Sequence, residues 1–370
     1  MKFLKPIMKN IAVVMFAITT LTGCAQTKNI KTVDGKTLSI ATLNTAIEKA
    51  MNESKLPGLS IAIINKKQLV YHQVFGVSNS NTKEPLNNQS MFEGASLSKP
   101  IFAYFVMKMV ENGTIELDKP LHEYLPHPGI SPESQDDYKL ITARMVLAHQ
   151  TGFPNHANNQ PIKLAFKPGT DFMYSGEAYQ YLAAVIGIKL GVGFKEALNQ
   201  LFQEKVTEPL NMPHTTFVWD DYLESHKVFG HNNEGQPTQN KPGEGRWSGK
   251  TFNAFSSVHS EASEFSKFII AMLKKEGLSE KSIDEMLKEQ TQFKNDNAMK
   301  LETGQTGWGL GFAQKPTKNG TMHLHTGNNH DFQAYVMFVP EQEYGLVLFT
   351  NCGNMLPFIK EISKTLGEQF

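Results

Sequence analysis

Ser96 and Lys99 are two residues whose types and spacing could together make a nucleophile. They lie in the segment Ser96-Leu97-Ser98-Lys99-Pro100. Because proline is tolerated in the first turn of a helix but not in its interior, a helix is predicted to begin near Ser96 to Ser98. The lysine follows the serine by one helical turn, so its amine can return to the serine hydroxyl. A serine hydroxyl is a weak nucleophile unless a base accepts its proton, and a lysine can do this only if burial lowers its pKa.

The same spacing also fits a capped surface helix without chemistry, because Ser-x-x-Lys occurs by chance in many chains. Two later segments favour the catalytic interpretation. Tyr174-Ser175-Gly176 follows Phe166-Lys167-Pro168-Gly169, a turn that could deliver the tyrosine into a cleft. His325-Thr326-Gly327 precedes a predicted strand, and glycine there would allow backbone and ligand to approach closely.

Strand-like runs at both ends of the chain would form the frame that positions these residues. Residues 61–64 and 69–75 predict a hairpin, and so do residues 331–339 and 344–349. Apolar residues recur at helical spacing near each terminus. We therefore predict an α/β (α+β) fold: a mostly antiparallel sheet, assembled from both termini and flanked by helices, with a helical subdomain inserted. The single domain would span 41–370, with its sheet part in 41–95 and 300–370 and its helical part in 96–299.

Composition excludes several other classes of protein. The chain has 370 residues, of which 40% are hydrophobic and 19% charged, so it can bury a substantial core. Its 36 basic and 36 acidic residues leave no net field for a polyanion, so we expect no nucleic-acid partner. Two cysteines cannot make a disulfide scaffold or a Cys-rich zinc module. We expect the protein to act as a monomer.

The N-terminus resembles an export signal. Lysines at positions 2, 5 and 9 precede the apolar run 11–20, which is too short for a comfortable membrane span. The run ends in Leu21-Thr22-Gly23-Cys24, which resembles a bacterial lipobox. This predicts a signal peptide over 1–23, a lipid on Cys24 and a polar tether over 24–40. An ordinary signal peptide or an N-terminal anchor is the alternative. The expected location is the periplasmic side of a membrane, as a lipoprotein of the outer membrane.

Taken together, the internal segments resemble the class C β-lactamase and serine D,D-peptidase group of penicillin-recognising enzymes, which also includes esterases. The resemblance covers about 42–369. The segment 141–154, which ends in His149-Gln150-Thr151-Gly152-Phe153-Pro154, is similar to the family's helix and turn before the tyrosine motif. The segment 307–312 is similar to its edge strand. The resemblance implies that Ser96 is the acylated nucleophile and Lys99 its proton partner. Tyr174, as tyrosinate or hydrogen-bonded phenol, would share the base role and activate the deacylating water.

The resemblance also implies the groups that contact the substrate. The backbone N–H groups of Ser96 and Asn328 would form the oxyanion hole. In the third motif, completed by Gly327, His325 and Thr326 would meet the substrate's carboxylate or the tyrosine oxygen. No cofactor is implied. His323, His325, His330 and Asp331 suggest a zinc site at first sight, but no matched acid lies between the histidines, so no metal is predicted.

Two positions depart from the family pattern. Gly176 stands where the family has an asparagine that contacts the lysine and the substrate's amide side chain. His325 stands where true class C β-lactamases have lysine, and a histidine with a reference pKa of about 6.5 is mostly neutral at pH 7. The sequence thus predicts a serine hydrolase acting on a small-molecule or peptidoglycan-like ester or amide: a short ester, a D-amino-acid peptide or a β-lactam. The alternative is a penicillin-binding lipoprotein that is acylated without turnover.

Overall fold

A nine-stranded sheet, in the order β5-β4-β3-β13-β12-β11-β10-β9-β8, forms the frame of the protein. The computed structural model describes residues 29–369. All neighbouring strands pair antiparallel, and strands from both ends of the chain meet where β3 pairs with β13, as predicted. The strands are β3 (Gly58–Asn65), β4 (Gln68–Asn79), β5 (Glu84–Pro85), β8 (Thr291–Gln292), β9 (Gly307–Trp308), β10 (Ala313–Thr317), β11 (Gly320–Asn328), β12 (Gln333–Val339) and β13 (Tyr344–Thr350).

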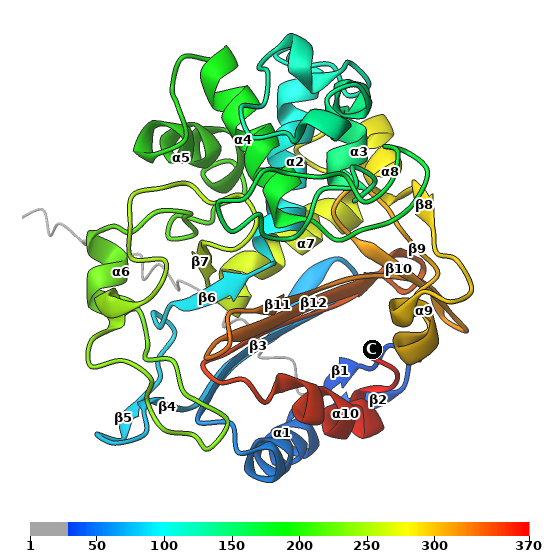
Figure 1. Cartoon of the computed structure of the whole chain (residues 1–370). Coiled ribbons are helices and arrows are strands. Elements are labelled where there is room, and N and C mark those ends of the chain that lie inside the picture. The colour runs from blue at the N-terminus through cyan, green and yellow to red at the C-terminus, as the bar shows by residue number, and fades with distance from the viewer. Residues whose placement is uncertain (1–28, 370) are drawn as a thin grey trace, which may run out of the picture.

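The terminal helices cover one face of this sheet (Figure 1). Helix α1 (Ile40–Ser54) and helix α10 (Met355–Leu366) pack against each other. Successive residues of a strand point to opposite faces. Accordingly, Ile61 and Ile63 of β3 join the core beneath α1 and α10, whereas Ala62 and Ile64 join the core on the other face. The sheet is therefore buried on both sides.

Residues 29–39 form a small hairpin, so the tether predicted over 24–40 was too long. Strand β1 (Asn29–Lys31) pairs antiparallel with β2 (Thr37–Ser39). Ile30 and Val33 are 2% and 1% exposed and belong to the core beneath α1 and α10, which fixes the hairpin to the domain. The predicted signal peptide, Cys24 and the rest of the tether lie outside the described residues.

Most of the remaining helices lie on the other face of the sheet, whereas α9 lies at its β9–β10 end (Figure 1). Helix α2 begins at Ser98 with Pro100 in its first turn, as predicted, and it is buried along most of its length. The remaining helices are α2 (Ser98–Glu111), α3 (Ala143–Leu147), α4 (Gly176–Lys189), α5 (Glu196–Phe202), α6 (Asp221–His226), α7 (Ala262–Lys274), α8 (Glu280–Leu287) and α9 (Ala298–Thr303). A separate two-stranded ribbon is formed by β6 (Phe92–Ala95) and β7 (Val258–Ser260).

The segment 307–312 was expected to supply the edge strand of the sheet, but β9 is second from the edge because β8 pairs outside it.

None of the helices within residues 29–369 is long and apolar enough to cross a bilayer.

Candidate active site

Ser96 lies in the sharp connection between β6 and α2. Ala95 before it has a φ of 48°, a left-handed conformation that is uncommon for residues other than glycine. The hydroxyl of Ser98 donates to the Ala95 carbonyl at 2.7 Å and accepts from the Val258 N–H at 2.9 Å, which ties the turn to β7. The Ser96 backbone N–H makes no hydrogen bond with residues 29–369, so it is available for an oxyanion.

Lys99 is buried beside this serine. Lys99 is only 1% exposed, and its Nζ lies 3.2 Å from Ser96 Oγ. The same Nζ donates to the Phe255 carbonyl oxygen at 2.9 Å and lies 4.5 Å from the Tyr174 ring centre. Burial lowers the pKa of Lys99 well below its usual range. A neutral amine at this distance can accept the serine proton.

Tyr174 faces the same pair from an aromatic cluster. Its ring centre lies 4.4 Å from that of His149 and 5.9 Å from that of Trp308. Burial raises the pKa of Tyr174, and a hydrogen bond with the Ser96 hydroxyl opposes that shift. Because burial dominates, the phenol and not the tyrosinate is the form favoured in the free protein.

His149 holds the loop that carries Tyr174 in place. Its Nδ1 accepts from the Ser175 N–H at 3.1 Å, and its own φ is 57°. Burial lowers the pKa of His149 well below its usual value, with Lys99 contributing, so the imidazole is neutral.

The third motif brings His325 beside Tyr174, with ring centres 6.1 Å apart. His325 Nδ1 lies 2.8 Å from the Thr326 carbonyl oxygen, and the residue is 3% exposed. Burial, with a contribution from Lys99, lowers the pKa of His325 to about 3. The expected contact with a substrate carboxylate would therefore have no positive charge at this position. Gly327 serves packing: an added Cβ would lie 2.3 Å from the Gly94 carbonyl oxygen of β6, so the close approach is to backbone and not to a ligand.

Two cavities meet at Ser96, and Asn155 and Asn328 line both of them. The first, which we call the Trp308 cavity, has a volume of about 370 Å³. The second, the Phe255 cavity, has a volume of about 510 Å³ and includes the guanidinium-bearing Arg246. The further residues of the Trp308 cavity are Tyr174, Met299, Thr303, Gln305, Trp308, Ala313, Leu324, His325 and Thr326. A substrate spanning Ser96 can therefore place one part in each cavity.

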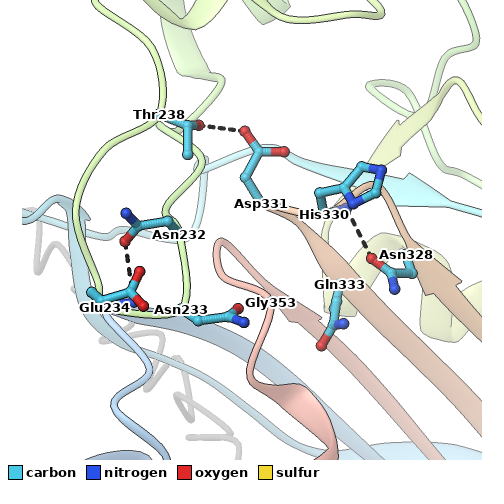
Figure 2. Close-up of a pocket in the computed structure, with 9 residues that line it drawn as sticks. All are labelled: Asn232, Asn233, Glu234, Thr238, Asn328, His330, Asp331, Gln333 and Gly353. Atoms are coloured by element: carbon cyan, nitrogen blue, oxygen red, sulfur yellow. Dashed lines mark hydrogen bonds between the residues drawn. The ribbon is translucent and has the colours of Figure 1, made fainter.

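A third hollow, the hairpin depression, lies beside Asn328 at the turn between β11 and β12. It also has a volume of about 370 Å³ and is lined by polar residues of the 232–238 loop and of the turn (Figure 2). Residues 29–369 hold no group of three or more His, Cys, Asp or Glu side chains arranged to bind a metal ion. His323, one of the histidines considered for zinc, stacks on Phe338 instead, with ring centres 5.2 Å apart.

With this geometry in view, comparison with known proteins is decisive for the family. The family model described as Beta-lactamase matches residues 43–361. The chain belongs to the beta-lactamase family. Among curated proteins, this family member is 24% identical to "Protein flp" of Staphylococcus aureus (strain MW2) over 331 residues, which are 84% of this chain and 62% of the relative. It thus spans less than two thirds of that relative's length.

Solved structures of low identity share the fold of this beta-lactamase family member. "EstCE1, a hydrolase with promiscuous acyltransferase activity" matches with a TM-score of 0.75 and 18% identity, covering 88% of this chain and 97% of that one. The D-alanine carboxypeptidase AmpC from Burkholderia cenocepacia matches with a TM-score of 0.70 and 19% identity, covering 88% and 98%. The antiparallel sheet flanked by helices is therefore the fold of this family.

The glycine that departs from the family's tyrosine motif has a packing reason. A Cβ on Gly176 would lie 2.8 Å from Cδ2 of Phe255 and 2.9 Å from the Asn155 carbonyl oxygen. The Gly176 N–H donates to Asn155 Oδ1 at 2.9 Å. Position 176 thus has no room for asparagine as packed here, and the Phe255 ring occupies the space.

Sequence reasoning missed several groups of this site, among them Asn155, Phe255, Gln305 and Trp308. Phe255 acts through a backbone carbonyl 156 residues from Lys99, and any residue type could provide that oxygen. Trp308 was noted only as part of a strand. No pattern of residue types signals these positions, because they are selected by the fold that surrounds Ser96.

Proposed function

We propose that this protein is a serine hydrolase that works through an acyl-enzyme on Ser96 and prefers short esters to β-lactams and D-peptides. The observation that carries the proposal is Lys99: a buried amine whose Nζ lies 3.2 Å from Ser96 Oγ and whose pKa burial lowers. This pairing gives the serine the base that it lacks on its own.

In the acylation step, Lys99 accepts the Ser96 proton while Oγ forms a bond to the ester carbonyl carbon. The N–H groups of Ser96 and Asn328 would stabilise the oxyanion. The carbonyl then reforms, the bond to the alcohol oxygen breaks, and the proton passes from Lys99 through the Tyr174 hydroxyl to that oxygen. In deacylation, water loses a proton along the same path in reverse and attacks the acyl carbon. Ser96 Oγ leaves and regains a proton.

The preference for esters rests on two departures from the family. His325 is neutral, so the Trp308 cavity offers no cation at this position to the carboxylate that β-lactam antibiotics and D-peptides carry. Gly176 offers no side-chain amide to an acylamino group. Esters need neither contact, and their alcohols leave more readily than amines.

The test combines labelling with turnover. A fluorophosphonate should add to Ser96, as peptide mapping of the adduct would establish, and Ser96→Ala should remain unlabelled. Wild-type protein should release acid from short esters repeatedly. A stable penicillin adduct on Ser96 without turnover of any ester would instead favour the penicillin-binding alternative. Equal labelling of Ser96→Ala would contradict both.

We also propose that the protein is exported and anchored by a lipid on Cys24. The support is the order Leu21-Thr22-Gly23-Cys24 after a basic and an apolar segment. Wild-type protein should fractionate with membranes, and Cys24→Ala should not. Membrane association that survives this substitution would require a different anchor.

A further inference from the structure

One side chain, the amide of Asn329, joins three segments that each carry a part of the site. Its Nδ2 donates to Glu93 Oε2 at 2.6 Å, and its Oδ1 accepts from the Ser256 hydroxyl at 2.7 Å. Nδ2 also donates to the Ser256 carbonyl oxygen at 3.3 Å. We call these contacts the Asn329 bridge. A single amide thus ties the β11–β12 turn to β6 and to the loop before β7.

Two of the bridged residues are direct neighbours of groups used in the proposed reaction. Asn329 follows Asn328, whose N–H would stabilise the oxyanion. Ser256 follows Phe255, whose carbonyl oxygen accepts the hydrogen bond from Lys99 Nζ at 2.9 Å. A shift at either end of the Asn329 bridge would therefore move the oxyanion donor or the acceptor that holds the lysine.

Glu93 anchors the Asn329 bridge to the strand that leads to the nucleophile. It lies in β6, three residues before Ser96, and is 2% exposed. Lys227 Nζ lies 3.1 Å from its Oε1, in a buried ion pair that is not a well-aligned hydrogen bond. Because a carboxylate only accepts, Glu93 also sets the orientation of the amide: Nδ2 faces Glu93, and Oδ1 faces the Ser256 hydroxyl.

The rate of a reaction at Ser96 depends steeply on these positions. A misplacement of about 1 Å can cost about 10²-fold in rate, and removal of one oxyanion donor typically costs about 10²–10³-fold. The hydrogen bond from Asn329 to Glu93 has a carboxylate as acceptor, and hydrogen bonds of this kind are stronger than those between neutral groups. The Asn329 bridge is therefore suited to hold these groups with the precision that catalysis needs.

We propose that Asn329 is a positioning residue, which holds the Asn328 N–H and the Phe255 carbonyl oxygen in the arrangement that favours the transition state. This inference rests on the proposed acyl transfer at Ser96. Acylation and deacylation both pass through an oxyanion, so both should slow together when the bridge is lost. The loss should then lower kcat and leave KM nearly unchanged. Asn329 also borders the Phe255 cavity, and a role in binding the substrate would raise KM instead.

Asn329→Ala removes the whole bridge and is the first test. With a short ester, we expect kcat to fall about 10–100-fold and KM to stay within about three-fold of wild type. A trifluoromethyl ketone with the same acyl group forms an adduct on Ser96 that carries an oxyanion, so its affinity should weaken by the same factor as kcat/KM. Glu93 is left intact, because its loss would leave Lys227 buried without a counter-ion.

Asn65→Ala is the matched control for a purely structural effect. Asn65 is also buried, and its amide also bridges two segments: Nδ2 donates to the Lys31 carbonyl oxygen at 3.0 Å, and Oδ1 accepts from the Lys31 N–H at 2.8 Å. It joins β1 to β3 and lines neither cavity at Ser96. Its loss should lower the free energy of unfolding in urea, while kcat stays within two-fold of wild type.

A double-mutant cycle shows whether the bridge acts as a unit. Ser256→Ala deletes the hydroxyl that donates to Asn329 and keeps the backbone. If both side chains act through the Asn329 bridge, the double variant should have the kcat of Asn329→Ala within about two-fold, since one change already removes what the other would remove. Independent structural effects would instead multiply.

The outcomes separate this inference from the proposed function. Wild-type kcat in Asn329→Ala, a rise in KM alone, or multiplicative losses in the cycle would each overturn the positioning role and leave Ser96 as the nucleophile. Failure of the wild-type protein to hydrolyse any short ester would overturn the proposed ester preference. The rate of Ser96 labelling by a fluorophosphonate would then replace kcat in the same comparison of variants, with the same expected losses.

Discussion

The Trp308 cavity and the hairpin depression share Asn328 in their linings, yet their polar groups differ in how they are paired. In the depression, the groups pair with one another: Thr238 donates to Asp331, and the His330 N–H donates to Asn328 Oδ1 (Figure 2). Among the residues of the cavity, Gln305 and Trp308 each have a buried polar atom that pairs with nothing in residues 29–369.

The hydrogen-bonded groups of the depression contribute to the fold. The Thr238–Asp331 hydrogen bond ties the 232–238 loop to the β11–β12 turn, and the His330–Asn328 hydrogen bond lies within that turn. The Trp308 cavity, in contrast, is bordered by Ser96 and Tyr174, so changes there can affect the reaction directly. The comparison predicts large functional effects around Ser96 and mainly structural effects around Thr238.

The largest effect is expected from Lys99→Met, which keeps the length of the side chain and removes the base. Ester turnover should fall by about 10³-fold, while the fold persists because the site is already apolar enough to bury methionine. The measurement is kcat/KM for a short ester, with circular dichroism to establish folding. Activity within ten-fold of wild type would assign the base role to another group.

Tyr174→Phe should reduce turnover by about 10²-fold. The ring keeps its packing against His149 and Trp308, so the loss reports the hydroxyl alone. Pre-steady-state kinetics would show whether acylation, deacylation or both slow down. A protein within a few-fold of wild type would leave proton transfer to Lys99 by itself.

Gly176→Ala should lower stability and activity moderately, because its Cβ would press on Phe255 and on the Asn155 carbonyl. Overpacking of this kind costs about 1–3 kcal/mol. The check is the free energy of unfolding in urea, compared with a Gly→Ala change at Gly249, where an added Cβ meets nothing within 4 Å. Equal stability of both variants would mean that the Phe255 ring moves aside freely.

The smallest effect is expected in the hairpin depression. Thr238→Val removes the hydroxyl that donates to Asp331 and should cost about 0.5–1.5 kcal/mol of stability. Ester kcat/KM should stay within two-fold of wild type. A ten-fold loss of activity without a change in thermal stability would make the depression part of the substrate site and would break the comparison.

The sequence predicts the parts of this site that depend on local spacing. Ser96 and Lys99 are one helical turn apart, and the sheet follows from strong apolar runs at both ends. The surroundings of that pair could not be predicted, because the Phe255 carbonyl and Trp308 reach it through long-range packing. The β1–β2 hairpin was missed for a different reason: two strands of three residues each show too short an alternation to stand out from a polar linker.

The central claim is that buried Lys99 activates Ser96, and the pH dependence of Ser96 labelling by a fluorophosphonate tests it most directly. A neutral amine is the active form, so the rate should rise with pH through the pKa of Lys99, which lies well below 10.5, and then level off. Lys99→Met should label slowly, without that transition. A wild-type rate that climbs with hydroxide concentration without levelling off, in parallel with Lys99→Met, would contradict the account.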